Sequence, residues 1–284
     1  MYPLITPQEL AELLGKPDPP TLLDVRWALT GPPGRTDYEQ GHLPGAVFLD
    51  MDTELSSTPG LGGRHPLPSV AMLQATLRSA GVRATTPVVA YDAADGSVAA
   101  RAWWLLRWAG HPAVAVLDGG VAAWRAAGLP MTTEIPTPHP GTFTVQPAAM
   151  AVIDATLAAE LAREGVLLDA RAAPRYRGET EPVDPRAGHV PGARNAPFSA
   201  LTDAQGRWLP PAQLRELAQQ WGADGDGRAL GVYCGSGINA CALVLGLEVA
   251  GVSTAQCPVA LYAGSWSQWC TDPDRPVATG PEPG

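Results

Sequence analysis

GHLPGA at residues 41–46 returns as GHVPGA at residues 188–193, and LLDVR at 22–26 returns as LLDAR at 167–171. Two further pairs follow the same order: VVAYD at 88–92 with LGVYC at 230–234, and the segment 119–124 with 264–269. Four ordered matches at nearly constant separation indicate a duplication. The sequence therefore predicts two similar domains, 1–130 and 149–284. Residues 131–148 between them are rich in proline and are expected to form an extended linker.

Each repeat alternates short apolar runs with helical stretches. In the first repeat the runs TLLDV, PVVAY and AVAVLD have the length of buried strands, and helices are expected at 7–14, 69–80, 97–109 and 121–127. Apolar strands that alternate with helices are typical of a parallel sheet covered by helices on both faces. We therefore expect an α/β fold, in which ligands bind at the carboxyl ends of the strands.

Composition excludes several classes of function. The 284 residues carry a formal net charge of −9, so nonspecific nucleic-acid binding lacks its usual electrostatic attraction. No apolar run approaches the roughly 20 residues that cross a bilayer, and the N-terminal residues do not resemble a signal peptide. The four cysteines include no CxxC pair, so neither a structural metal nor a disulfide framework is expected. A cytoplasmic enzyme without metal or cofactor fits these features.

The segment ALGVYCGSGINA at 229–240 carries the chemistry. A predicted strand ends at Tyr233, and Cys234 and a glycine-containing turn lead into a helix expected to begin at Cys241. Glycine allows the backbone to turn successive N–H groups inward, and the helix adds its positive N-terminal end. This arrangement favours a thiolate at Cys234, which is a nucleophile. Phosphatases of the Cys-x5-Arg type would need arginine at position 240, which is Ala240, so phosphoryl chemistry is disfavoured.

The string CGSGINA, the two GHxPGA motifs, LLDAR and YAGSWSQW resemble the two-domain rhodanese family of sulfurtransferases over essentially the whole chain. The resemblance implies two tandem rhodanese-like domains and a persulfide on Cys234. The CGSG loop is similar to that of the 3-mercaptopyruvate sulfurtransferases. Thiosulfate-using members usually carry basic residues after the cysteine, but this chain has Gly235 and Ser236 there. Mercaptopyruvate is therefore the expected donor, and thiosulfate is the alternative. In the first repeat Asp92 stands where Cys234 stands in the second, which implies a catalytically silent first domain.

The same resemblance implies further site residues. An arginine that binds the anionic donor maps onto Arg175, and Arg186 is the nearest match to a second arginine whose family position is Asp184 here. The family's Asp–His–Ser relay maps onto Asp52, His65 and Ser236. The loop residues expected to hold the transferred sulfur are Gly235, Gly237, Ile238 and Asn239.

The expected reaction moves sulfur from a small anionic donor to a thiol, a thioredoxin-like protein or cyanide. A hypothesis of another class is a noncatalytic sulfur carrier or anion sensor, and turnover with a small donor distinguishes the two. The intact Cys234 favours the enzyme. The sequence does not choose the physiological acceptor or the oligomeric state.

Overall fold

The computed structural model describes residues 1–225, 227–254 and 257–284, which form two compact units. Each unit contains one parallel sheet of five strands, ordered β1-β5-β4-β2-β3 in the first and β6-β10-β9-β7-β8 in the second. The strands of the first sheet are β1 Leu4–Ile5, β2 Thr21–Asp24, β3 Val47–Phe48, β4 Val88–Tyr91 and β5 Val114–Leu117. Those of the second are β6 Val152–Ile153, β7 Val166–Asp169, β8 Arg194–Asn195, β9 Leu230–Tyr233 and β10 Ala260–Tyr262. The two orders are equivalent, which confirms the predicted α/β fold in two copies.

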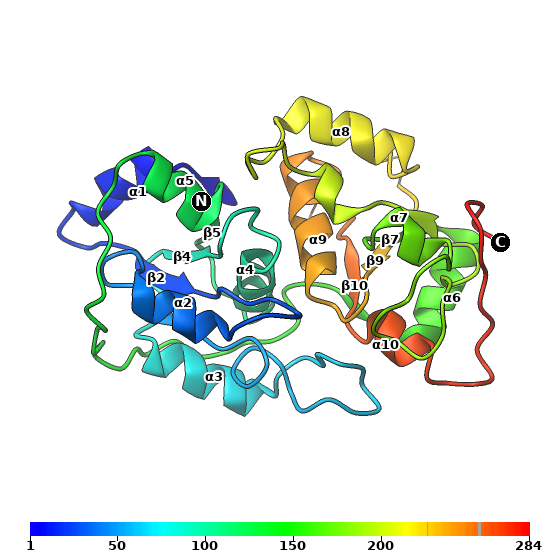
Figure 1. Cartoon of the computed structure of the whole chain (residues 1–284), viewed down its shortest axis with the longest axis horizontal. Helices are drawn as coiled ribbons and strands as arrows, with labels where there is room; N and C mark the ends of the chain where they lie inside the picture. The colour runs from blue at the N-terminus through cyan, green and yellow to red at the C-terminus, as the bar shows by residue number, and fades with distance from the viewer. Residues whose placement is uncertain (226, 255–256) are drawn as a thin grey trace. The chain divides into compact units, whose positions relative to one another are not determined.

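Helices connect the strands. Those at 7–14, 70–79, 99–108 and 120–126 lie within two residues of the predicted ranges, and the helix at 34–40 was not predicted. The first unit has α1 Pro7–Leu14, α2 Gly34–Gln40, α3 Val70–Ser79, α4 Ala99–Trp108 and α5 Gly120–Ala126. The second has α6 Ala155–Glu164, α7 Ala173–Tyr176, α8 Pro211–Gln220, α9 Asn239–Val249 and α10 Ser265–Trp269, with a 3-10 turn at Phe198–Ala200. Figure 1 shows the second sheet between α9 on one face and α6 on the other, as a parallel sheet buried on both sides requires.

The repeated sequence motifs hold the sheets together. In the second unit Arg171 donates to the buried carboxylate of Asp169 at 2.7 Å and to the carbonyl oxygen of Gly188 at 2.7 Å. The ring of His189 stacks on Tyr176 with centroids 3.8 Å apart. The first unit repeats these contacts with Arg26, Asp24 and Gly41, and with His42 on Tyr38. The motifs that reveal the duplication therefore have a structural role in both copies.

Two segments pack with the unit formed by the other repeat. Residues 58–67 belong to the second compact unit and residues 202–208 to the first. The first of these segments is fixed to α10, because Gln268 Nε2 donates to the Leu61 carbonyl at 2.9 Å and the Arg64 N–H donates to Ser267 Oγ at 2.9 Å. At Gly63, with φ +101°, a Cβ would lie 2.6 Å from the carbonyl oxygen of Gly264, so this close approach requires glycine.

The segment expected as a linker, 131–148, packs along the first unit. Phe143 and Val145 are buried, and the N–H of Phe143 donates to the Val82 carbonyl at 3.1 Å. The segment is extended, as its prolines predict, but its backbone is tied to the loop after α3. Within the described residues, no helix has the length and apolar character needed to cross a bilayer.

Candidate active site

The loop between β9 and α9 lies at the carboxyl end of a central strand of the second sheet (Figure 1). Cys234 follows β9 directly and is 4% exposed, and Gly237 turns the chain with φ +86°. Helix α9 begins at Asn239, two residues earlier than expected, with Ile238 at its N-cap position and no side-chain cap. The first backbone N–H groups of α9 are therefore not capped by a side chain, and its positive N-terminal end follows the loop.

The sulfur atom of Cys234 is held inside this loop. The N–H of Gly237 donates to Cys234 Sγ at 3.1 Å. A Cβ at Gly237 would lie 2.5 Å from the carbonyl oxygen of Ala263, so both the φ angle and the space require glycine. An N–H donor aimed at sulfur in a buried site stabilises the anionic form of that sulfur.

Ser265 supports the loop and was not found by sequence reasoning. Its side chain is fully buried, and its φ of +53° is unusual for a residue other than glycine. Ser265 Oγ accepts from the Cys234 N–H at 3.1 Å and donates to the Tyr262 carbonyl at 2.9 Å. The next two N–H groups, of Trp266 and Ser267, donate to the carbonyl oxygens of Cys234 and Gly235. The start of α10 therefore fixes the backbone of the cysteine.

Two of the three predicted relay residues meet in the second unit. His65 Nδ1 lies 2.8 Å from Ser236 Oγ, and both side chains are buried. The contact exists because residues 58–67 pack with this unit. Asp52 belongs to the first unit, where it is exposed and its carboxylate accepts from Trp27 Nε1 at 3.0 Å. Its participation in a relay stays a prediction.

The predicted arginines differ in their surroundings. Arg175 is held by Glu181, with Nη2 2.6 Å from Oε1, and its Nη1 would lie 3.3 Å from a Cβ placed on Gly235. Arg186 instead donates to the carbonyl oxygens of Asp272 and Arg275, at 3.1 and 3.2 Å. These hydrogen bonds hold the segment after α10 and do not reach the cysteine loop.

Sequence reasoning missed a second arginine at the loop, Arg64. Its Nη2 would lie 3.4 Å from a Cβ placed on Gly235, and its Nη1 forms an ion pair with Asp184 at 2.6 Å. The one signal in the sequence was its position next to His65 in Gly62-Gly63-Arg64-His65. The loop carries no cation of its own, but two guanidinium groups lie over it.

The comparison with known proteins agrees with this geometry. A family model of the Rhodanese-like domain matches residues 6–127 and again residues 154–272. The chain belongs to the rhodanese-like family.

Relatives of this rhodanese-like chain match it nearly end to end. A Pseudomonas aeruginosa protein provisionally named 3-mercaptopyruvate sulfurtransferase is 49% identical, over 98% of both chains. A Mycobacterium tuberculosis protein provisionally named thiosulfate sulfurtransferase SseB is 47% identical, over 98% of this chain and 97% of the relative. The crystal structure of SseA from Escherichia coli, described as a 3-mercaptopyruvate sulfotransferase with the rhodanese fold, superposes with a TM-score of 0.82. It is 29% identical, over 94% of this chain and 100% of that one.

The equivalent loop of the first rhodanese-like unit holds a carboxylate in place of the thiol. Asp92 is buried, and its two oxygens accept four backbone N–H groups, from Ala94, Gly96, Val98 and Ala99. Burial and, to a smaller extent, the charge of Asp95 raise the pKa of Asp92 to about 6, against the opposing effect of the N–H donors. The backbone N–H groups of this loop therefore also bind an anionic group, but here that group is the protein's own Asp92 carboxylate.

We expect Asp92 to make the stability of the first unit depend on pH. Its pKa in the folded chain exceeds the ordinary value of 3.8, so folding takes up a proton between these values. That stabilisation is complete below the ordinary pKa and is lost as pH rises through about 6. The difference between the two pKa values corresponds to about 3 kcal/mol in the free energy of unfolding.

Denaturant unfolding of the wild type and of Asp92→Asn at a series of pH values tests this. The free energy of unfolding of the wild type relative to the variant should fall from about pH 4 to about pH 7. If the difference in unfolding free energy between the wild type and Asp92→Asn stays flat or rises with pH, the raised pKa of Asp92 is contradicted.

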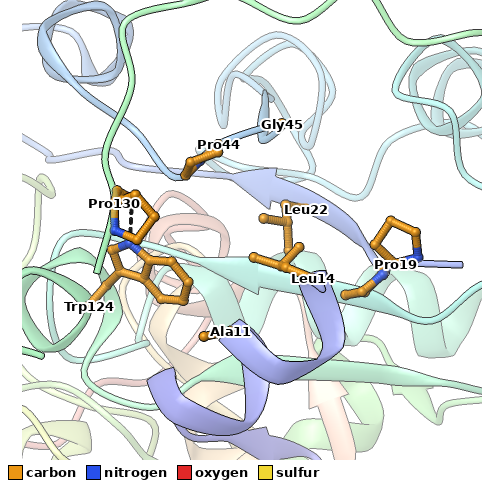
Figure 2. A pocket seen from close by; sticks show the side chains of 9 residues that line it. Ala11, Leu14, Pro19, Leu22, Pro44, Gly45, Trp124 and Pro130 are labelled. Carbon is orange, nitrogen blue, oxygen red and sulfur yellow. Dashed lines mark hydrogen bonds between the residues drawn. The ribbon is translucent and has the colours of Figure 1, made fainter. Parts of the chain in front are cut away.

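A separate pocket of about 490 Å³ lies in the first unit (Figure 2). It is apolar, and Trp124, Pro44 and Leu22 are among the residues that line it. None of the predicted site residues lines it, so this pocket is distinct from the cysteine loop. Among the described residues, no cluster of three or more His, Cys, Asp or Glu side chains is arranged to hold a metal ion.

Proposed function

We propose that this chain is a sulfurtransferase that takes sulfur from 3-mercaptopyruvate onto Cys234 and passes it to a thiophilic acceptor. The observation that carries the proposal is the placement of Cys234 Sγ, which accepts the Gly237 N–H inside the loop that leads into the N-terminus of α9. The names of the relatives at 49% and 47% identity support sulfur transfer as the reaction type.

In the first half-reaction the thiolate of Cys234 attacks the sulfur of the donor. A new S–S bond forms, the C–S bond of mercaptopyruvate breaks, and its electron pair stays on carbon as the enolate of pyruvate. A proton then reaches that carbon, and the thiol proton of the donor can supply it. The product is a persulfide whose negative charge is stabilised by the loop N–H groups and the helix terminus.

In the second half-reaction an acceptor thiolate attacks the outer sulfur of the persulfide. The S–S bond to Cys234 breaks, and the cysteine thiolate is regenerated. Cyanide can take the same sulfur as thiocyanate. The first step converts the Cys234 thiolate to a persulfide and the second step restores it, so the cycle leaves the oxidation level of the enzyme unchanged. Neither step requires a bound cofactor. The proposed acceptors are small thiols and thioredoxin-like proteins.

The His65–Ser236 pair provides a route for the donor's proton. Mercaptopyruvate brings a thiol hydrogen on the transferred sulfur and leaves as a strongly basic enolate. Thiosulfate brings no such hydrogen and leaves as sulfite, which needs no proton. A hydroxyl 2.8 Å from a buried imidazole nitrogen, one residue from Gly237, can accept or pass on a proton at this place.

Ser236→Ala and His65→Gln should therefore separate the two donors. We expect each variant to lower kcat/KM for mercaptopyruvate by about 10²-fold, the low end of general acid–base effects. The loss with thiosulfate should be much smaller. Steady-state kinetics with both donors and cyanide as acceptor measure this, and equal losses for both donors would remove the pair from proton transfer.

Thiosulfate remains the second candidate donor. Two arginines over Gly235 can attract any small anion, and one relative is named for thiosulfate. The decisive experiment is a side-by-side measurement of kcat/KM for the two donors on the wild-type chain. A higher value for mercaptopyruvate supports the proposal, a higher value for thiosulfate replaces the donor, and no turnover with either favours a noncatalytic carrier.

A further inference from the structure

The hydroxyl of Ser265 bridges the ends of two neighbouring strands. β9 and β10 pair in parallel, and the last pair is Val232 with Leu261. Beyond this pair, Ser265 Oγ donates to the Tyr262 carbonyl at 2.9 Å and accepts the Cys234 N–H at 3.1 Å. Because the hydroxyl hydrogen is used at Tyr262, the oxygen lone pairs remain for the Cys234 N–H. The side chain therefore fixes the peptide group that precedes the nucleophile.

The two peptide groups that follow Cys234 are held by the start of α10. The Trp266 N–H donates to the Cys234 carbonyl at 2.9 Å. The Ser267 N–H donates to the Gly235 carbonyl at 2.8 Å. The C=O and N–H of a trans peptide point in opposite directions, so the N–H groups of Gly235 and Ser236 point away from α10. These bonds keep both carbonyl oxygens, which would repel an anionic sulfur, directed at α10.

The first unit repeats this backbone arrangement without the hydroxyl. In the repeated segments Ser265 corresponds to Gly120, and their φ angles are +53° and +51°. The next two N–H groups after Gly120 again donate to the loop, to the carbonyl oxygens of Asp92 and Ala93 at 3.0 Å each. A Cβ at Gly120 would lie 2.6 Å from the Asp92 carbonyl oxygen, so a side chain does not fit there. The backbone of this turn therefore forms without a hydroxyl.

The second unit has a serine where glycine would fold more easily. A left-handed φ is unfavourable for a residue with a Cβ and costs glycine nothing. The side chain of Ser265 is fully buried, so its hydroxyl must find partners inside the protein, and those partners are Cys234 and Tyr262. A residue held in an unfavourable backbone conformation beside a nucleophile points to a functional constraint.

We propose that Ser265 is a positioning residue for sulfur transfer, whose hydroxyl holds the peptide of Cys234 so that N–H groups, and not carbonyl oxygens, face the transferred sulfur. The inference rests on the proposed function and adds a residue that acts through the backbone of the nucleophile. N–H donors that are fixed in advance stabilise an anion better than donors that must first be ordered. The hydroxyl therefore contributes to both the thiolate and the persulfide.

Ser265→Gly tests this role, because Gly120 shows that glycine adopts the same backbone conformation. With mercaptopyruvate and cyanide, we expect kcat to fall by about tenfold while KM for the donor changes by less than about twofold. Alkylation of Cys234 by iodoacetamide, followed by peptide mass spectrometry, should reach half of its maximal rate at a pH about one unit higher than in the wild type. A purely structural role would change the free energy of unfolding and leave this pH profile unmoved.

Thr271→Ala is the matched control. Thr271 Oγ1 donates to the Gln268 carbonyl at 2.8 Å, with the same three-residue spacing as Ser265 and Tyr262, but it is exposed just after α10. This variant should leave kcat and the alkylation profile unchanged. Should Ser265→Gly fold poorly, Ser265→Ala also lacks the hydroxyl and gives the same two readouts.

An alkylation profile of the Ser265 variants that matches the wild type overturns the inference. Alkylation needs no sulfur donor, so this result is independent of the proposed function. A wild-type chain that turns over neither donor contradicts the proposed function, whereas a shifted alkylation profile in the same chain still supports the action of Ser265 on Cys234.

Discussion

Replacing Cys234 with serine should abolish sulfur transfer from either donor. A serine hydroxyl is not ionised near neutral pH and cannot carry a sulfane sulfur, so neither half-reaction can proceed. Loss of the nucleophile from a catalytic site typically lowers kcat by about 10⁴-fold or more. Thiocyanate formation from mercaptopyruvate and cyanide measures the effect.

Cys257→Ser is the matched control for this variant. Cys257 is half-buried, lies outside the loop, and its Sγ contacts the Arg228 carbonyl at 3.7 Å. Its replacement should leave kcat/KM unchanged. Activity retained by Cys234→Ser, or lost equally in both variants, would contradict a single nucleophile.

Gly237→Ala should have the second largest effect. With φ +86° and the Ala263 carbonyl 2.5 Å from the new Cβ, the loop must move, and the N–H that donates to Cys234 Sγ moves with it. Strain of this kind costs about 1–3 kcal/mol of stability. Misplacement of catalytic groups by about 1 Å can lower the rate by about 10²-fold.

The matched control for this strain is Gly128→Ala. Gly128 also has a positive φ, +69°, but a Cβ there would contact nothing within 4 Å. Gly128→Ala should lower the free energy of unfolding by about 1 kcal/mol and leave kcat per folded molecule unchanged. If Gly237→Ala retains full kcat in the folded protein, the loop N–H does not act on the sulfur.

Most of the fold could be predicted because the duplication left local signals in both copies. LLDVR and GHLPGA specify a buried ion pair and a stacked histidine, and these contacts lie within one unit. The start of α9 was predicted two residues late because Gly237 and Asn239 resemble loop residues in isolation. The packing of residues 58–67 and 202–208 with the opposite units depends on contacts distant in sequence, which no local pattern encodes.

The candidate site was predicted to the extent that it lies in one loop. Cys234 follows from the local motif, and Ser236 and His65 follow from the resemblance to the family. Arg64 was missed because its guanidinium reaches Gly235 only through the packing of the 58–67 segment. Arg186 was named from its position in the sequence, but its donors are taken by carbonyl groups after α10.

The central claim is that Cys234 carries the transferred sulfur. Peptide mass spectrometry of the wild-type chain, incubated with mercaptopyruvate in the absence of an acceptor, tests it directly. The account predicts that the peptide containing Cys234 gains the mass of one sulfur atom and that cyanide removes it. Pyruvate release with an unmodified Cys234, or sulfur found on another cysteine, would contradict it.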